Sequence, residues 1–333
     1  MAGPSTCLIT QAEVRKVLTM AEALAAVEEA FRAYAEGRAQ MPPKPYLHFD
    51  KGDLRTMPAY LPGLGLATVK NVNVHPGNKD LPAVMATLTL FDPDTGFALA
   101  VMDGTYLTAM RTGAAGGIAA RHLAREGSAV AAFVGAGRQA ETQLEALLAT
   151  VPTVRRVLVY DLDAEKARRF AVRASQTHGV EASPAALESA VAAADVVVTV
   201  TPARAPVVRK EFVRPGTHIN AIGADAPGKQ ELDVAILQSA KVVVDNWEQA
   251  SHGGEINVAV SRGLMRRGDI YAELGEIVIG RKPGRQDPHD VTVFDSTGLA
   301  IQDVACAAHV YRRLTSDPQS RAALRRIDFL SDA

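Results

Sequence analysis

The strongest constraint on the fold comes from a glycine-rich turn, Val-Gly-Ala-Gly-Arg-Gln-Ala, at residues 134–140. An apolar β-type segment (128–133) precedes it, and a segment with leucines on one helical face follows it. In the order strand, turn and helix, Gly135 permits a tight turn and Gly137 lets the backbone approach a pyrophosphate, while Ala140 allows the helix to pack closely. The free amides at the start of the helix then favour phosphate. The turn therefore predicts a Rossmann-type dinucleotide-binding domain.

The next strand indicates which dinucleotide is bound. The segment Arg-Val-Leu-Val-Tyr-Asp (156–161) ends on Asp161, about 20 residues beyond the glycine turn. A carboxylate at this spacing binds the ribose hydroxyls and repels a 2′-phosphate. Leu162 follows it, where an NADP-binding protein would often have an arginine. We therefore expect NAD as the cofactor.

Composition excludes several other classes of protein. A chain of 333 residues with 47% hydrophobic residues can form two domains. The net charge of −1, without a polybasic run, argues against nucleic-acid and anionic-membrane partners. No apolar stretch approaches the ~20 residues needed to span a bilayer, and the segment after Met1 has no signal-peptide pattern. Cys7 and Cys306 lack CxxC spacing, so we expect a reducing cytoplasm. The histidines lack ligand spacing, so we expect no metal site.

The chain changes its pattern near residue 128. Before that point, two capping boxes (Thr10 with Glu13, Thr19 with Glu22) predict helices, and short alternating segments predict a mainly antiparallel sheet. The expected strands there are 46–50, 54–59, 66–74, 83–92 and 98–102, followed by a helix of small residues at 105–124. After residue 128, apolar strands alternate with helices, which predicts a parallel sheet. Its expected strands are 128–134, 156–160, 195–200, 217–222, 241–245 and 291–294, and a last helix near 298–313 is expected to return to the first domain.

The first domain offers cations for substrate binding. Lys70 shares one strand face with apolar residues, where an ammonium is costly unless it is paired or used. It is either a lysine that reaches the solvent or a desolvated lysine with a pKa low enough for acid–base work. Arg111 is the first charge in an apolar helix, and Arg55 is a weaker candidate on a strand. Arginine suits a planar carboxylate, so these residues favour a small 2-oxo, 2-imino or 2-amino acid.

Two further segments follow strands of the second domain, where ligands of open α/β sheets bind. Asp225 and Lys229 lie in the segment 218–232, and Asp225 is either a partner for an amine or an N-cap for a helix starting near Gln230. Ser296 and Thr297, after the last strand, could donate hydroxyl hydrogen bonds. Cys306 lies among apolar helix residues and is expected in the core.

Taken together, four motifs resemble the ornithine cyclodeaminase/μ-crystallin family. They are Thr-Ala-Met-Arg-Thr-Gly-Ala-Ala (108–115), Gly-Ala-Gly-Arg-Gln-Ala (135–140), Gly-Ala-Asp-Ala-Pro-Gly-Lys-Gln-Glu-Leu (223–232) and Asp-Ser-Thr-Gly (295–298). Three more stretches resemble its archaeal-type alanine dehydrogenase branch: Met-Pro-Pro-Lys (41–44), Asn-Val-His-Pro-Gly-Asn (73–78) and His-Gly-Gly-Glu-Ile-Asn-Val-Ala-Val (252–260). The resemblance covers nearly the whole chain in the right order.

The resemblance implies an α/β fold: a Rossmann-type doubly wound parallel sheet plus a discontinuous α+β substrate and dimerisation domain with a mainly antiparallel sheet. We place the substrate domain at 1–118 with 305–333, and the NAD-binding domain at 119–304. A homodimer is expected.

Residue roles follow from the same resemblance. Lys70 matches the catalytic lysine and Asp225 the acid near the substrate amine. Arg55 and Arg111 match carboxylate contacts, and Lys44 falls where cyclodeaminases have a substrate-facing arginine. The expected cofactor-binding residues are Arg111, Thr112, Gly135, Ala136, Gly137, Arg138, Gln139, Asp161, Thr201, Gly223, Asp225, Lys229 and Ser296.

These roles lead to an expected reaction. We expect NAD-dependent, reversible oxidative deamination of L-alanine to pyruvate and ammonia. The alternatives are a ketimine or imine reductase acting on cyclic or N-alkyl imino acids, an ornithine cyclodeaminase, and a non-catalytic binding protein like μ-crystallin. Cyclodeaminases carry an acid where this chain has Arg55, and a cation there is a poor partner for the δ-amine of ornithine.

Overall fold

The computed structural model describes residues 5–330, and the chain forms two compact units. Unit 1 consists of Met1–Arg111 with Leu299–Ala333, and unit 2 consists of Thr112–Gly298. The units divide after Arg111 and Gly298, whereas the sequence analysis placed the boundaries after residues 118 and 304. Both the observed division after Arg111 and residue 118 lie inside helix α3 (Thr105–Leu123), so no turn marks this boundary in the sequence. The roles assigned to the two domains stay predictions.

Unit 1 is built on a seven-stranded sheet in the order β17-β1-β6-β5-β4-β3-β2. Its strands are β1 (Thr6–Ile9), β2 (Tyr46–Phe49), β3 (Gly52–Leu61), β4 (Leu66–Val74), β5 (Val84–Phe91), β6 (Ala98–Asp103) and β17 (Arg325–Ile327). Neighbours from β2 to β6 are antiparallel, as the alternating segments predicted. The exception is β1, which pairs parallel with β6 and antiparallel with β17. Strands β1 and β17 were not predicted, because they are too short to show a period of two.

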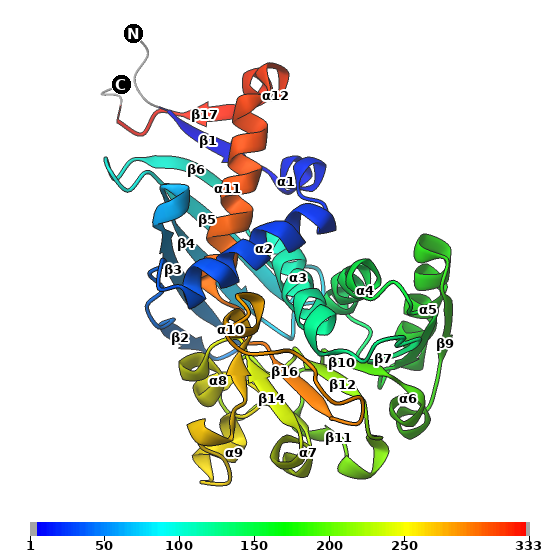
Figure 1. Cartoon of the computed structure of the whole chain (residues 1–333). Helices are drawn as coiled ribbons and strands as arrows, with labels where there is room; N and C mark the ends of the chain where they lie inside the picture. The colour runs from blue at the N-terminus through cyan, green and yellow to red at the C-terminus, as the bar shows by residue number, and fades with distance from the viewer. Residues whose placement is uncertain (1–4, 331–333) are drawn as a thin grey trace. The chain divides into compact units, whose positions relative to one another are not determined.

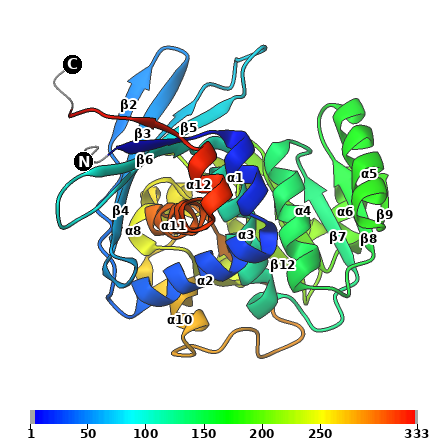
Figure 2. The same cartoon turned by 90° about the horizontal axis from the view of Figure 1, so that it is seen from above.

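Helices of unit 1 cover one face of this sheet (Figures 1 and 2). They are α1 (Gln11–Val17), α2 (Met20–Ala35), α11 (Ala300–Ser316) and α12 (Pro318–Ala323), with a short 3-10 helix, η1 (Pro62–Leu64). Both predicted capping boxes are present at the starts of α1 and α2. The predicted return of the last helix is also confirmed, since α11 packs on α2, β3 and β4. Cys306 on α11 is fully buried, as expected.

Unit 2 is a doubly wound fold around an eight-stranded sheet in the order β15-β14-β16-β12-β10-β7-β8-β9. All its strand pairs are parallel. The strands are β7 (Val130–Val134), β8 (Arg156–Tyr160), β9 (Glu181–Pro184), β10 (Val196–Thr199), β12 (His218–Ala221), β14 (Lys241–Val244), β15 (Ala272–Glu273) and β16 (Thr292–Asp295). A separate parallel pair joins β11 (Arg204–Val208) to β13 (Gln230–Leu232). The α/β fold class is therefore confirmed.

Alternate residues of the central strands of unit 2 enter two different cores. Ala131 and Phe133 of β7 pack with helices α4 (Arg138–Thr150) and α5 (Ala164–His178). Ala132 and Val134 enter the other core, with α6 (Leu187–Ala193) and α7 (Val234–Ser239). Unit 2 also contains the helices α8 (Trp247–Gly253), α9 (Asn257–Ser261) and α10 (Leu274–Val278), with two short 3-10 helices, η2 (Lys210–Phe212) and η3 (Arg267–Asp269). Burial on both faces explains the near-continuous apolar runs in the sequence.

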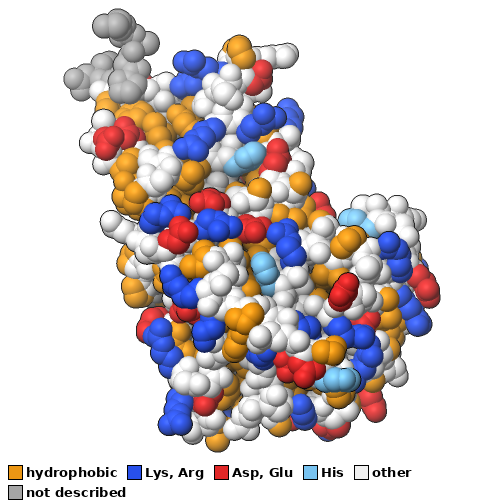
Figure 3. Space-filling model, viewed as in Figure 1, with side chains coloured by type: hydrophobic (Ala, Val, Ile, Leu, Met, Phe, Trp, Pro, Cys, Tyr) orange, Lys and Arg blue, Asp and Glu red, His pale blue; other side chains and the backbone are white. Residues whose placement is uncertain are grey.

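Two surface properties bear on possible partners. On the face shown in Figure 3, acidic and basic side chains are interspersed. Among residues 5–330, no helix is long and apolar enough to cross a membrane.

Candidate active site

Lys70 lies at the centre of a buried charge cluster in unit 1. Its neighbours on the same face of β4 include Leu66, Thr68 and Val72, so the period-two pattern places its side chain toward the core. The residue is fully buried, and its Nζ lies 2.7 Å from Asp303 Oδ2 on α11. The alternative of a lysine that reaches the solvent is therefore excluded.

Asp303 connects Lys70 to Arg111. The Arg111 Nε donates to Asp303 Oδ1 at 3.1 Å, and its Nη1 donates to Gln302 Oε1 at 3.2 Å. Asp303 has no exposed surface and Arg111 is 5% exposed, so one buried carboxylate faces two cations. When Lys70 is protonated, the cluster carries one more positive than negative charge, which suits an anionic ligand.

The surroundings of Lys70 favour its neutral form. Burial disfavours the ammonium, and the Arg111 charge acts in the same direction, while Asp303 opposes both; together these effects lower the pKa of Lys70 to about 7. Lys44, in the loop before β2, also lowers this pKa. A lysine with a pKa near 7 can both accept and donate a proton at neutral pH.

Arg55 is a neighbour of Lys70 on the adjacent strand. The pairing of β3 with β4 places Arg55 opposite Val72, and both Arg55 and Lys70 point to the buried face. Arg55 is only 4% exposed, so it is a buried strand arginine and not a surface one. Its Nε lies 2.7 Å from Asp53 Oδ1, and its guanidinium lies over the Tyr46 ring, 5.4 Å from the centroid. These contacts hold the guanidinium in one orientation.

In unit 2, the glycine turn has the geometry expected for a dinucleotide. Gly135 has φ of 103°, and a Cβ there would lie 3.0 Å from Val200 O, so only glycine fits. Gly137 is the N-cap of α4, and a Cβ on it would meet nothing within 4 Å. Asp161 directly follows β8, and its Oδ2 accepts a hydrogen bond from Ala136 N at 2.8 Å. The turn, the helix start and the acid fit the phosphates and the ribose of a dinucleotide.

Asp225 lies in the loop after β12, and its carboxylate pairs with Lys229 at 2.5 Å. The helix proposed near Gln230 does not form, because residues Gln230–Leu232 are strand β13, paired with β11. Asp225 is therefore not its N-cap.

Most of the other residues of unit 2 that were predicted to bind the cofactor form hydrogen bonds within the protein. Thr112 O accepts from Gln143 Nε2, and Gln139 Nε2 donates to Thr142 Oγ1. Thr201 and Gly223, at the ends of β10 and β12, both bind Glu231. Ser296 is buried, and its Oγ has no hydrogen-bond partner among the described residues. Arg138 opens α4.

Sequence reasoning missed three acids of these clusters: Asp53, Glu231 and Asp303. Asp53 lies two residues before Arg55 on one strand, so period-two spacing could have found this pair. Asp303 stands in the apolar run Ile-Gln-Asp-Val-Ala-Cys-Ala-Ala (301–308), where a buried acid needs a partner. The pattern indicates that a partner exists but does not identify Lys70.

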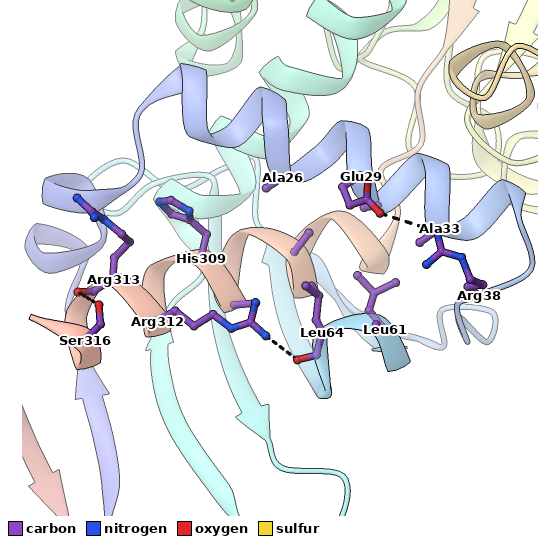
Figure 4. A pocket seen from close by; sticks show the side chains of 14 residues that line it. Ala26, Glu29, Ala33, Arg38, Leu61, Leu64, His309, Arg312, Arg313 and Ser316 are labelled. Carbon is purple, nitrogen blue, oxygen red and sulfur yellow. Dashed lines mark hydrogen bonds and ion pairs between the residues drawn. The ribbon is translucent and has the colours of Figure 1, made fainter.

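A separate hollow of about 420 Å³ lies in unit 1 and contains none of the predicted site residues. Figure 4 shows it between α2 and α11, with Arg312 donating to Leu64 O and Arg38 paired with Glu29. Two of its three arginines, Arg38 and Arg312, are therefore already bound to the protein.

Histidine and metal chemistry have little support in the described part of the chain. Within residues 5–330, no group of three or more His, Cys, Asp or Glu residues could hold a metal ion. His218 is fully buried between Thr292 and Asn220, and burial lowers its pKa to about 3. It is therefore a neutral core residue at neutral pH.

Comparison with known proteins gives consistent matches. The family model for the ornithine cyclodeaminase/mu-crystallin family matches residues 5–317. Alanine dehydrogenase of Archaeoglobus fulgidus is 56% identical over 313 residues, which cover 93% of this chain and 96% of that protein.

Two solved structures are similar over their whole length. An archaeal alanine dehydrogenase dimer with bound NAD has a TM-score of 0.93 and 54% identity, covering 98% of this chain and 100% of that chain. Δ1-pyrroline-2-carboxylate reductase of Thermococcus litoralis, in complex with NADH and L-proline, also has a TM-score of 0.93, with 36% identity. That match covers 97% of this chain and 100% of the other. The resemblance in the motifs is thus confirmed over nearly the full chain, which belongs to the ornithine cyclodeaminase/mu-crystallin family.

Proposed function

We propose that this chain is an NAD-dependent alanine dehydrogenase that interconverts L-alanine with pyruvate and ammonia. The observation that carries the proposal is the buried cluster of Lys70, Arg111 and Asp303, in a chain 56% identical to an archaeal alanine dehydrogenase. A buried lysine with a pKa near 7 beside an arginine suits proton transfer at a small substrate that carries a carboxylate.

Each residue of the unit 1 cluster has a proposed role. Arg55 binds the substrate carboxylate, because Asp53 holds its guanidinium in one orientation on the buried face that it shares with Lys70. Arg111 supplies a second positive charge. Lys44 adds to the positive field around Lys70, consistent with a substrate-side position. A short side chain is favoured because Arg55 disfavours an ammonium at the far end of the substrate.

Lys70 is the proposed acid and base. In the direction of amination, its ammonium polarises the carbonyl of pyruvate and donates a proton as ammonia adds. It then accepts and returns protons as the carbinolamine loses water to form the iminium. Asp225 steadies the incoming ammonia or the iminium charge, with Lys229 as its resting partner. NAD, when bound, supplies the redox chemistry of the nicotinamide ring.

Unit 2 contains the proposed NAD site. Gly135, Gly137 and the start of α4 bind the pyrophosphate, and Asp161 binds the ribose hydroxyls. Further proposed contacts in unit 2 come from Thr112, Ala136, Arg138, Gln139, Thr201, Gly223, Asp225, Lys229 and Ser296, and Arg111 is a proposed contact from unit 1.

We also propose a homodimer in the cytoplasm. Leu47, Phe49 and Val84 of the unit 1 sheet are 60%, 48% and 40% exposed, and such apolar surface is typical of an interface. A similar solved alanine dehydrogenase is described as a dimer. Both cysteines are free and buried, which agrees with a reducing compartment.

The test is NADH oxidation by the purified protein with ammonia and a panel of 2-oxo acids. We expect turnover with pyruvate plus ammonia. Turnover only with Δ1-pyrroline-2-carboxylate, or only with pyruvate plus methylamine, would replace this function by an imine reductase. Formation of proline and ammonia from ornithine without net NADH would indicate a cyclodeaminase, and NADH binding without any turnover a binding protein.

A further inference from the structure

Glu231 is a fully buried carboxylate that collects four hydrogen bonds in unit 2. Its Oε2 accepts from Thr199 Oγ1 at 2.7 Å and from Gly223 N at 2.8 Å. Its Oε1 accepts from Thr201 N at 2.6 Å and from Thr201 Oγ1 at 2.7 Å. Burial raises the pKa of Glu231, and these donors oppose that shift because they stabilise the carboxylate.

The donors come from the ends of two neighbouring strands. Thr199 is the last residue of β10 and Thr201 follows it, whereas Gly223 follows β12. β10 lies beside β7 in the sheet. From β7 the chain continues to β8 on one side, and from β10 it continues to β12 on the other side. Open α/β sheets bind ligands at such a change of direction. Glu231 thus connects the two loops that contain Thr201, Gly223 and Asp225.

The loops after β10 and β12 approach each other closely at Gly223 and Thr201. A Cβ on Gly223 would collide with Thr201 O and would lie 2.6 Å from the Glu231 carboxyl carbon. The position therefore accepts only glycine, and the two backbones are held together around one carboxylate. Removal of this carboxylate would leave buried donors without an acceptor.

Glu231 is itself held firmly. Its backbone N donates to Glu255 Oε1 at 2.9 Å, and Leu232 N donates to the same oxygen at 2.6 Å. Glu255 is also fully buried. The carboxylate of Glu231 therefore has a fixed position from which to orient the loops.

We propose that Glu231 is a positioning residue that shapes the loops after β10 and β12 for the dinucleotide before it binds. This inference rests on the proposed function, because it takes these loops as part of the NAD site. A loop that is already ordered loses less conformational entropy when a ligand binds, so Glu231 contributes to affinity without contact with the cofactor.

The first test compares Glu231→Gln with Glu273→Gln. Glu273 is the control, because it is a partly buried acid of unit 2 whose carboxylate also accepts a backbone hydrogen bond, from Trp247 N. NADH dissociation constants are measured by fluorescence titration, and KM values for NADH and pyruvate by steady-state kinetics. We expect a rise of about tenfold in Kd and KM for NADH in Glu231→Gln, since the amide leaves buried donors unsatisfied. KM for pyruvate at saturating NADH, and all constants of Glu273→Gln, should stay within about twofold, a split that general loss of stability would not produce.

Two further measurements cover the case in which Glu231→Gln does not fold. Thr199→Val removes one donor to Glu231 while it keeps the side-chain shape, and should raise the NADH Kd about threefold. In the cofactor-free wild type, the Thr201 and Gly223 amides should exchange slowly with deuterium. Amides that exchange fast until NADH is added, or a folded variant with unchanged NADH affinity, would overturn the inference. Failure of the wild type to bind NADH would instead reject the proposed function.

Discussion

Lys70 on β4 and Asp303 on α11 form an ion pair whose Nζ–Oδ2 distance is 2.7 Å and whose side chains are fully buried. The pair joins β4 of the unit 1 sheet to α11, the helix that packs on this sheet. Arg111 shares the Asp303 carboxylate, so the cluster has two cations and one anion. In these surroundings the pKa of Lys70 is lowered to about 7, so that both its protonated and its neutral form are populated at neutral pH.

Replacement of Lys70 should remove most activity while the fold remains. We expect Lys70→Met to lower kcat for pyruvate amination by about 10²–10⁴-fold, because a positioned acid–base group contributes that much. Methionine keeps the packing volume, and Arg111 still neutralises Asp303. Lys210→Met, which removes a lysine that binds Ser239 on the surface, is the control. Near-normal kcat in Lys70→Met would show that the role assigned to Lys70 is wrong.

The pH profile should report the Lys70–Asp303 pair. In the amination direction the lysine must be protonated, so the wild-type rate should fall as pH rises through about 7, with the concentration of free NH₃ held constant. The Asp303 charge raises the pKa of Lys70, and its loss in Asp303→Asn should therefore move the midpoint to lower pH.

A control for this profile is Asp53→Asn, which removes the partner of Arg55 but leaves the Lys70 pair intact. We expect a higher KM for pyruvate in that variant and the wild-type midpoint. A midpoint unchanged in Asp303→Asn would exclude Lys70 as the titrating group.

Cofactor choice should depend on Asp161. The double change of Asp161→Ser with Leu162→Arg removes the repulsion of a 2′-phosphate and adds a cation, so kcat/KM for NADPH relative to NADH should rise by at least ~100-fold. Asp163→Ala is a close control, because Asp163 caps α5 through Glu165 N and Lys166 N. It should reduce thermal stability without a change of preference. An equal shift in both variants would contradict the role of Asp161.

Oligomeric state can be tested at the exposed apolar residues of the unit 1 sheet. A charged residue in a buried interface is strongly unfavourable, so Phe49→Asp should shift a dimer toward monomer in sedimentation velocity experiments. Leu162→Asp is the control, because Leu162 is a 94% exposed apolar residue of unit 2. A dimer that survives Phe49→Asp with unchanged dissociation constant would place the interface elsewhere.

Asp295 should make stability depend on pH. Burial raises its pKa to about 8, so the folded state binds this proton more strongly than the unfolded state does. Its contribution to stability is present below the ordinary carboxyl pKa and is lost as pH rises through about 8. Asp295→Asn keeps an acceptor for Ile256 N and should have a Tm that rises relative to wild type between pH 5 and pH 8.5, by about 3 °C or more. A difference that does not vary with pH would contradict the shifted pKa.

The sequence predicted the regular parts of the fold well. The strand Leu66–Val74 has the predicted bounds, because nine residues of clear alternation leave little choice of register. The glycine turn is equally local, since strand, turn and helix follow one another in the chain. The short strands Thr6–Ile9 and Arg325–Ile327 were missed because only pairing with distant residues makes them strands.

Some residues of the candidate site could be predicted from the sequence, because a charged residue in an apolar segment is unusual by itself. Lys70 on an apolar face and Arg111 in an apolar helix are two such residues. Asp303, the partner of both residues, could not be predicted, because the pairing depends on how α11 packs on the unit 1 sheet. Glu231 was missed for the same reason, since its four hydrogen bonds join segments that only the folded sheet brings together.

The discontinuity of unit 1 has a consequence for folding during synthesis. Asp303 is 192 residues away from Arg111 along the chain, and all of unit 2 lies between them. A ribosome therefore synthesises the whole of unit 2, which is continuous, before it makes the helix that supplies the Asp303 carboxylate to Lys70 and Arg111. We expect unit 2 to fold first, while the nascent sheet of unit 1 waits with uncompensated charge and an uncovered apolar face. Such a nascent chain is a natural client for chaperones until its last 35 residues are made.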